Sequence, residues 1–267
     1  MGRLMKYDLR AAMKLFVPLW IGTLFLSIVN RFTLPAIDQM ENGAVRLFFG
    51  LIMTAYVLAI LAIVIVAIIY IVLRFYQGLL KDEGYLTFTL PVSIDAILWS
   101  KALTGVVLLT ISGAVALLSM FMQMMEQGDL KILGGVLMEL LEAAGTGNTV
   151  MIFICAILAA VSTCLSSIFQ AYCAMGFGQL AQKRKLAASI LAYVIISFVI
   201  SMVTGVGVMP LAVHVLEMLG KPNVLQIFNG PHGVWVLLLG FALYNLLYVV
   251  VFYFPARYIF KNKLNLE

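Results

Sequence analysis

Two long apolar runs without a charged residue place the strongest constraint on how this chain can fold. They are Leu47–Leu73 and Ala102–Met125. Each is long enough to cross a bilayer as a helix, which takes about 20 residues. The composition agrees, since the 267 residues are 64% hydrophobic and 11% charged, with a mean hydropathy of +1.09. A soluble domain would be roughly a quarter charged. The solvent of this chain is therefore expected to be a lipid bilayer.

Four further apolar runs bring the expected number of spans to six. The six runs are Phe16–Asn30, Leu47–Leu73, Ala102–Met125, Val150–Ala181, Leu186–Val213 and Val234–Phe254. They predict an all-α, polytopic membrane protein with a single transmembrane domain over residues 1–267. Two external segments are expected, 126–149 and 210–233. Almost nothing is left for a soluble domain, so the chain is not expected to be an enzyme or to hold a cofactor of its own.

The basic residues are distributed unevenly between the two sides of these spans. Thirteen of the seventeen Lys and Arg residues fall on the side that holds both termini and the loop 81–101. Cytoplasmic loops carry such an excess, so both termini and this loop are predicted to be cytoplasmic, in a multi-pass protein of the cell membrane. The net charge of +5 is then a topology signal. Nucleic acid is not an expected partner, because that needs a basic domain in water.

The first fifteen residues read as an amphipathic helix. Its four cations fall within about 80° of one another at 100° per residue: Arg3, Lys6, Arg10 and Lys14. Such a stripe faces lipid phosphates, so residues 1–15 are predicted to form a separate elbow helix in the headgroup plane. The alternative is a simple cytoplasmic extension of the first span.

Chemistry-bearing residues are scarce within the spans. No Asp, Glu, Lys or Arg lies in the central part of any of them, which argues against proton-driven transport. Cys155, Cys164 and Cys173 lie nine residues apart in one span and are interpreted as packing residues. His214 and His232 lack neighbouring acidic ligands, so no metal site is expected. The fourth span is rich in Ala, Ser and Thr, which suits close helix packing, with a pathway lining as the alternative.

The loop between the two charge-free runs, residues 81–101, has the most structured pattern. Its side chains mix charge with apolar groups, and Pro91 separates them from the next helix, for which Ser93 is the predicted N-cap. The pattern predicts a short, exposed, partly apolar helix, and such surfaces usually dock a partner. An ordinary interhelical connection is the alternative.

This loop resembles the cytoplasmic loop of type-2 ABC exporter permeases. There, an acidic residue and a glycine precede a short coupling helix, and a Leu-Pro-Val-Ser stretch leads into a helix with a lysine near its start. The matching residues are Glu83, Gly84, Leu86, Leu90, Pro91, Val92, Ser93 and Lys101. The chain has Tyr85 and Phe88 where many relatives have Thr and an aliphatic residue. The order of elbow, six spans and inside termini is also similar.

The resemblance implies one permease half of an ATP-driven exporter. A second permease subunit, in a homodimer, and a separate ABC ATPase carrying ATP and Mg would be its partners. The residues implied for ATPase coupling are Glu83, Gly84, Tyr85, Leu86, Phe88 and Leu90. The cargo implied is amphipathic or hydrophobic, first of all a peptide of the phenol-soluble modulin kind, with lipid or drug export as the alternative.

Two other classes of protein are alternatives to a permease. An intramembrane protease is disfavoured, because no HExxH motif or reactive Ser with a His partner occurs. A membrane scaffold or immunity subunit that binds a toxic peptide without moving it stays open. The second cytoplasmic connection, 179–185, is interpreted as a basic anchor, with a minor ATPase contact as the alternative.

Overall fold

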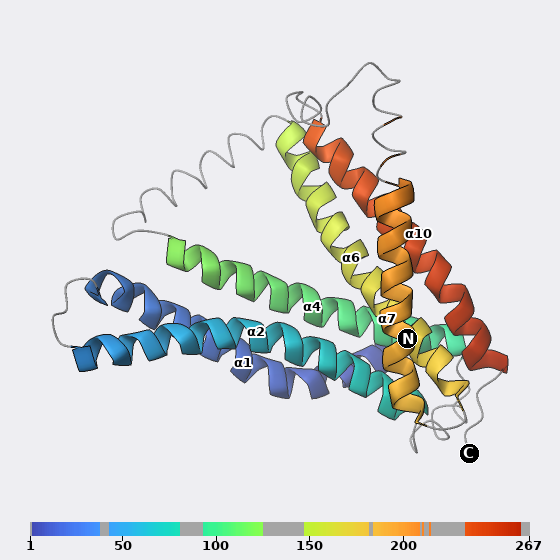
Figure 1. Cartoon of the computed structure of the whole chain (residues 1–267), viewed down its shortest axis with the longest axis horizontal. Helices are drawn as coiled ribbons and strands as arrows, with labels where there is room; N and C mark the ends of the chain where they lie inside the picture. Colours follow the sequence, from blue (N-terminus) through green and yellow to red (C-terminus); the bar gives the residue numbers. More distant parts are fainter. Residues whose placement is uncertain are drawn as a thin grey trace. The chain divides into compact units, whose positions relative to one another are not determined.

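The computed structural model is helical, and it describes residues 2–37, 43–80, 93–124, 147–181, 184–208, 210, 214 and 233–262. The elements are α1 (Gly2–Ile37), α2 (Gly43–Leu80), α4 (Ile94–Met124), α6 (Gly147–Gln179), α7 (Lys185–Met202), the π-helical segment η1 (Val203–Val208) and α10 (Gly233–Asn262). Within these ranges six helices are long and apolar enough to cross a membrane, so the predicted all-α polytopic class is confirmed. Figure 1 shows these helices, labelled and coloured in chain order from blue to red.

The start of α1 differs from the prediction. A separate elbow helix over residues 1–15 is not found, because α1 runs without a break from Gly2 to Ile37. The physical reason is tertiary packing. Asp8, Ala12 and Phe16 are buried, at 8%, 0% and 0% exposed, so the first turns pack on neighbouring helices as the rest of α1 does. The structure therefore has the alternative form, a first span extended at its N-terminus.

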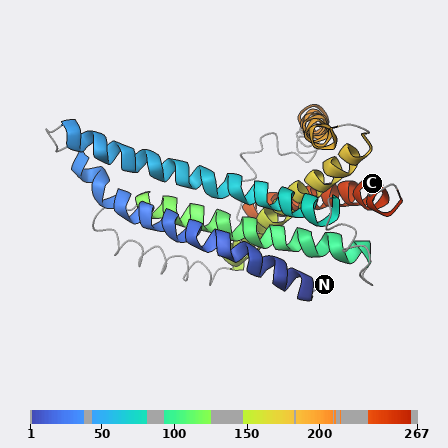
Figure 2. The same cartoon turned by 90° about the horizontal axis from the view of Figure 1, so that it is seen from below.

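The chain divides into two compact units, and the division falls within α2 and α4. Unit 1 comprises Met1–Arg74 and Ala96–Met138, and unit 2 comprises Phe75–Asp95 and Glu139–Glu267. In unit 1, α1, α2 and α4 lie side by side in both views (Figures 1 and 2). Their shared core contains Ala12, Phe16, Trp20, Ile63, Ala67 and Leu108.

A line of hydrogen bonds, named here the polar seam, joins α1 to α4 in unit 1. Its bonds run from Trp20 Nε1 to Ser112 Oγ (3.1 Å), from Ser27 Oγ to the Ser119 carbonyl (2.8 Å) and from Asn30 Nδ2 to Gln123 Oε1 (3.3 Å). The residue numbers rise together on the two helices, from Trp20 to Asn30 on α1 and from Ser112 to Gln123 on α4, so the two helices run parallel. Polar side chains between membrane helices find their partners in the neighbouring helix, and such bonds hold the helices together.

In unit 2, α6 and α10 pack along their length (Figure 1). Ser166 Oγ of α6 donates to Asn245 Oδ1 of α10 at 3.1 Å, and Ala159 and Ser162 are also buried. Packing is therefore the role of these three small residues of the fourth span. Ala160 and Ser167 are exposed and take no part in this interface.

The helix α7 is packed differently from its neighbours in unit 2. Only 6% of its most apolar stretch is buried by the described residues, against 39% for α6 and 17% for α10. The helix α6 ends at Gln179 and α7 begins at Lys185, directly after Arg184, which has a left-handed φ of 54°. Figure 2 shows α7 nearly end-on, at an angle to α6.

Candidate functional site

The residues predicted to couple to an ATPase lie outside the described part of the chain. These are Glu83, Gly84, Tyr85, Leu86, Phe88 and Leu90, all within the stretch 81–92. The structure does describe both flanks of this stretch. The helix α2 leads into it, and α4 begins at Ile94, directly after the predicted N-cap Ser93. The flanks carry three side-chain clusters, two in unit 2 and one in unit 1.

The first cluster, the aromatic cluster, fixes the end of α2 within unit 2. The Phe75 ring stacks on Tyr172 of α6 with centroids 3.7 Å apart and meets Phe260 of α10 edge-on at 5.5 Å. Phe169 contacts Tyr172 edge-on at 5.9 Å. The four side chains are 2% exposed or less. Buried aromatic pairs are each worth about 0.5–1.5 kcal/mol beyond their area, so this contact holds the last turns of α2, from Phe75 on, against α6 and α10.

The second cluster, the Asp95 cluster, fixes the start of α4 within unit 2. Arg257 of α10 forms a two-pronged ion pair with the Asp95 carboxylate, Nε to Oδ1 and Nη2 to Oδ2, both at 2.7 Å. The hydroxyl of Tyr253 donates to Oδ1 at 2.6 Å. Charge-assisted and bidentate bonds are the strongest of their kind and also fix orientation. Asp95 lies in the first turn of α4, where the helix dipole favours a negative charge.

Pro255 lies within α10, between the two residues that hold Asp95. A proline has no N–H to donate and its ring crowds the preceding turn, so it interrupts the backbone hydrogen bonds of a helix. Such positions are where helices bend. The Asp95 cluster therefore attaches the first turn of α4 to a point of α10 whose backbone hydrogen bonding is interrupted.

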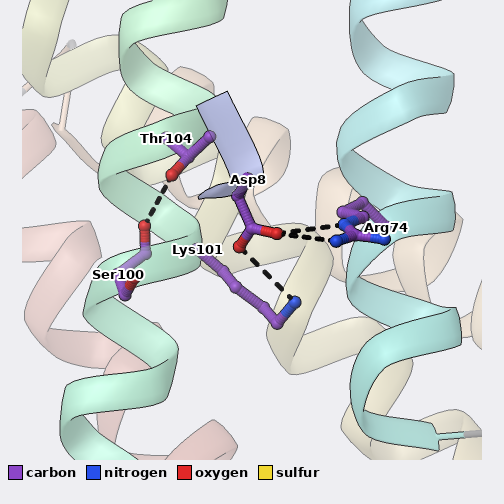
Figure 3. A network of polar contacts seen from close by, with 5 residues as sticks. All are labelled: Asp8, Arg74, Ser100, Lys101 and Thr104. Carbon is purple, nitrogen blue, oxygen red and sulfur yellow. Dashed lines mark hydrogen bonds and ion pairs between the residues drawn. The ribbon is translucent and has the colours of Figure 1, made fainter. Parts of the chain in front are cut away.

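The third cluster, the Asp8 cluster, belongs to unit 1 (Figure 3). Asp8 of α1 points between α2 and α4, where Arg74 Nη2 lies 2.9 Å from Oδ1 and Lys101 Nζ lies 3.9 Å from Oδ2. The Asp8 and Lys101 side chains are only 12% and 13% exposed, whereas that of Arg74 is 39% exposed. One carboxylate thus ties α1 to the two helices that border the stretch 81–92.

These ion pairs are not predicted from the sequence. The charges expected to matter in a membrane span are those in its middle, and Asp8, Asp95 and Arg257 lie near helix ends. A signal was nevertheless present, because Asp8 is the only acidic residue in the whole of α1 and lies on the face opposite Lys6 and Arg10. A single acid on the apolar face of such a helix is costly unless it meets a cation.

The predicted basic stripe lies on α1, and the structure shows which of its side chains are exposed. Lys6, Arg10 and Lys14 are exposed, while Asp8 and Ala12 on the other face are buried. Arg3 belongs to α1, and its side chain is outside the described residues. The stripe therefore faces away from the packed core of unit 1.

The remaining candidates show no arrangement for chemistry in the described ranges. Cys155, Cys164 and Cys173 are free thiols, and the first and last are buried in the packing of α6. No group of three or more His, Cys, Asp or Glu within the described residues could hold a metal ion. His214 is exposed, and His232 lies outside the described residues, as do most of the predicted external segments.

Comparison with known protein families, with curated proteins and with solved structures finds no match to this chain. Membership of the permease family therefore stays a prediction that depends on the residues of the loop 81–101.

Proposed function

We propose that this chain is the permease subunit of an ATP-driven exporter. The observation that carries the proposal is the attachment of both flanks of the stretch 81–92 to the same helix. Phe75 at one flank contacts Phe260 of α10, and Asp95 at the other is paired with Arg257 of α10. Because both flanks contact α10, a displacement of this stretch would reach that helix through two separate contacts.

The proposed mechanism is a lever. A separate ABC ATPase binds the residues Glu83 to Leu90, and closure of the ATPase displaces that segment. Because the segment is fixed at both flanks, the displacement passes into α10 through the Asp95 cluster and into α6 and α10 through the aromatic cluster. Packed interfaces switch between discrete arrangements, so small displacements at one end are transmitted along whole helices.

The proposed cargo is amphipathic or hydrophobic, and a peptide fits best. The polar side chains found between the described spans are neutral, as in the hydrogen bonds of Ser166 with Asn245 and of Gln170 with Ser197. Neutral groups of this kind offer no fixed charge to recognise a small ion. ATP and Mg would bind on the partner ATPase, and a second copy of this chain would complete the pathway, which fits the uncovered apolar surface of α7.

The test uses the complex isolated from native membranes in mild detergent and reconstituted into liposomes. We expect an ATPase to co-purify and its activity to rise with an amphipathic peptide. Phe88→Ala removes a docking side chain worth roughly 1.5–3 kcal/mol of apolar burial, so it is expected to lower peptide-stimulated hydrolysis at least tenfold. Arg257→Gln is expected to keep the ATPase bound while transport falls.

The matched control is Lys261→Gln, which removes an exposed cation one turn further along α10. It is expected to leave hydrolysis and transport unchanged. If no ATPase co-purifies and the chain still binds the peptide, a scaffold or immunity subunit is the better assignment. Transport by the chain alone under a pH gradient would contradict the proposal outright.

A further inference from the structure

We infer that the exposed stripe Lys6, Arg10 and Lys14 of α1 is a binding site for the headgroups of anionic phospholipids. The three side chains follow one another at four-residue spacing along one face, so each lies one turn after the last. All three are exposed. Within the described residues none of them forms an ion pair, since the acid of this segment, Asp8, points to the opposite side and is paired with Arg74 and Lys101.

The continuity of α1 sets the height of this stripe relative to a bilayer. A helix crosses the hydrocarbon core in about 20 residues, and the stretch from Leu15 to Thr33 is apolar apart from Arg31 and neutral polar groups. The residues just before Leu15 therefore lie at the level of the headgroups. Lysine and arginine place their charged ends in this layer while their stems cover apolar surface.

The neighbouring exposed side chains suit the same layer. Tyr7, Met13 and Leu15 are 69%, 37% and 49% exposed and lie between or beside the cations. Tyrosine is enriched where one end of a side chain is apolar and the other is wet, as at the edge of a membrane. Cations flanked by exposed apolar groups bind surfaces that carry both phosphate and acyl chains, which favours a lipid over a soluble phosphate.

The Asp8 cluster makes this a fixed site. Because Asp8 holds the first turns of α1 against α2 and α4, the three cations are presented without a free helix having to order first. A preordered site loses less conformational entropy on binding. The lipid chemistry expected is a phosphatidylglycerol-like headgroup, with one negative phosphate per cation.

The test measures lipid retained by the purified full chain, without any ATPase. Native mass spectrometry of the chain titrated with phosphatidylglycerol or phosphatidylcholine in detergent gives the affinity for each. We expect a clear preference for phosphatidylglycerol. The triple variant Lys6→Gln, Arg10→Gln, Lys14→Gln is expected to weaken it roughly a hundredfold, since each cation near a membrane surface contributes about a fivefold factor.

Two control variants keep the result interpretable. The variant Lys6→Arg, Arg10→Lys, Lys14→Arg keeps the charge and is expected to bind as wild type. The variant Arg46→Gln, Arg184→Gln, Lys261→Gln removes three other exposed cations and is expected to keep most of the affinity. Equal retention of both lipids, or an equal loss in the two triple Gln variants, would overturn the inference. Full displacement of the lipid by millimolar glycerol phosphate would also overturn it. None of these outcomes depends on whether the chain is a permease.

Discussion

At the scale of single residues, the Asp8 carboxylate should contribute measurably to the stability of unit 1. Asp8→Ala leaves Arg74 and Lys101 without their shared carboxylate. Breaking a fully buried pair costs about 3–5 kcal/mol, and since the Arg74 side chain is 39% exposed we expect about 1–3 kcal/mol here. Unfolding in mixed micelles with increasing SDS measures this difference.

The matched comparison is Asp95→Ala, whose ion pair is more open, with side chains 34% and 42% exposed. Solvent screens such a pair, so we expect about 1 kcal/mol or less. A larger loss of stability for Asp95→Ala than for Asp8→Ala would contradict this ranking.

The sequence predicted part of the arrangement of charged residues on α1. The exposure of Lys6, Arg10 and Lys14 follows from their spacing, since residues four apart share a face of any helix. The pairing of Asp8 with Arg74 does not follow, because it joins residues 66 apart along the chain. Only the packing of α1 on α2 decides which of the nearby cations the carboxylate meets.

At the scale of elements, the turn between α6 and α7 has a strict size requirement at Gly178. A Cβ at this position would lie 2.6 Å from both the Cα and the N of Ser189, which are backbone atoms of α7 that cannot move cheaply. We therefore expect Gly178→Ala to separate the two helices and to lower the thermal unfolding temperature by several degrees.

Gly176 provides the control for that change, two residues away on the opposite side of α6. A Cβ there would meet Ile259 and Phe260 at 3.5–3.6 Å, which is ordinary van der Waals contact. Gly176→Ala is expected to be neutral in the same melting experiment. Equal effects of the two substitutions would show that the close approach of Gly178 to Ser189 is wrong.

The far end of α7 is held by a cluster of hydroxyl groups. Thr204 of η1 bonds to Tyr244 of α10 at 2.5 Å, and Tyr244 bonds to Tyr248 at 2.7 Å. Since α7 is otherwise little buried by the described residues, this cluster should limit its motion. Tyr244→Phe is expected to cost about 0.6–1.7 kcal/mol. It should also broaden the distance distribution between spin labels at Ser201 and Leu243.

Tyr193→Phe is the control for that experiment, because Tyr193 is a tyrosine of α7 that is 42% exposed and lies outside the hydroxyl cluster. It should leave the distribution as in wild type. An unchanged distribution in Tyr244→Phe as well would mean that the hydroxyl cluster does not restrain α7.

The apolar runs in the sequence predicted that the six helices exist, but not at which residues each helix begins and ends. Apolar runs define where lipid can surround a helix, so all six spans were found from composition alone. The same runs do not say how far a helix continues into the polar layer. In α1 the amphipathic pattern of residues 1–15 fits a separate interfacial helix and an extended span equally well, and the burial of Ala12 and Phe16 decides between them.

At the scale of the whole molecule, the basic residues predict that both termini are cytoplasmic. We expect a cysteine at Glu83 to react with a membrane-impermeant maleimide only in opened cells. A cysteine at Gln127 should react in intact cells. The three native cysteines, which are free thiols, are first replaced by alanine to remove background. Labelling of position 83 from outside would show that the orientation is reversed.

The division into two units was not predicted from the sequence, which gave one transmembrane domain. The boundary falls between Arg74 and Phe75 and between Asp95 and Ala96, inside helices and without any change in composition. It is defined by which neighbours the side chains contact. Those contacts link residues far apart in the chain, such as Tyr253 with Asp95, which no local pattern encodes.

The polar seam has a consequence for how the protein is made. Trp20, Ser27 and Asn30 of the first span bond to partners 92 or 93 residues later, in the third span. At a synthesis rate of roughly 5–20 residues per second, the first span waits about 5–20 s before those partners leave the ribosome. During that time, polar groups that are fully buried in the finished fold, Ser27 and Asn30 at 0% exposed, have no third helix to bond to. The newly synthesised first span must therefore stay bound to the insertion machinery, or remain near the membrane surface, until the third span has been synthesised.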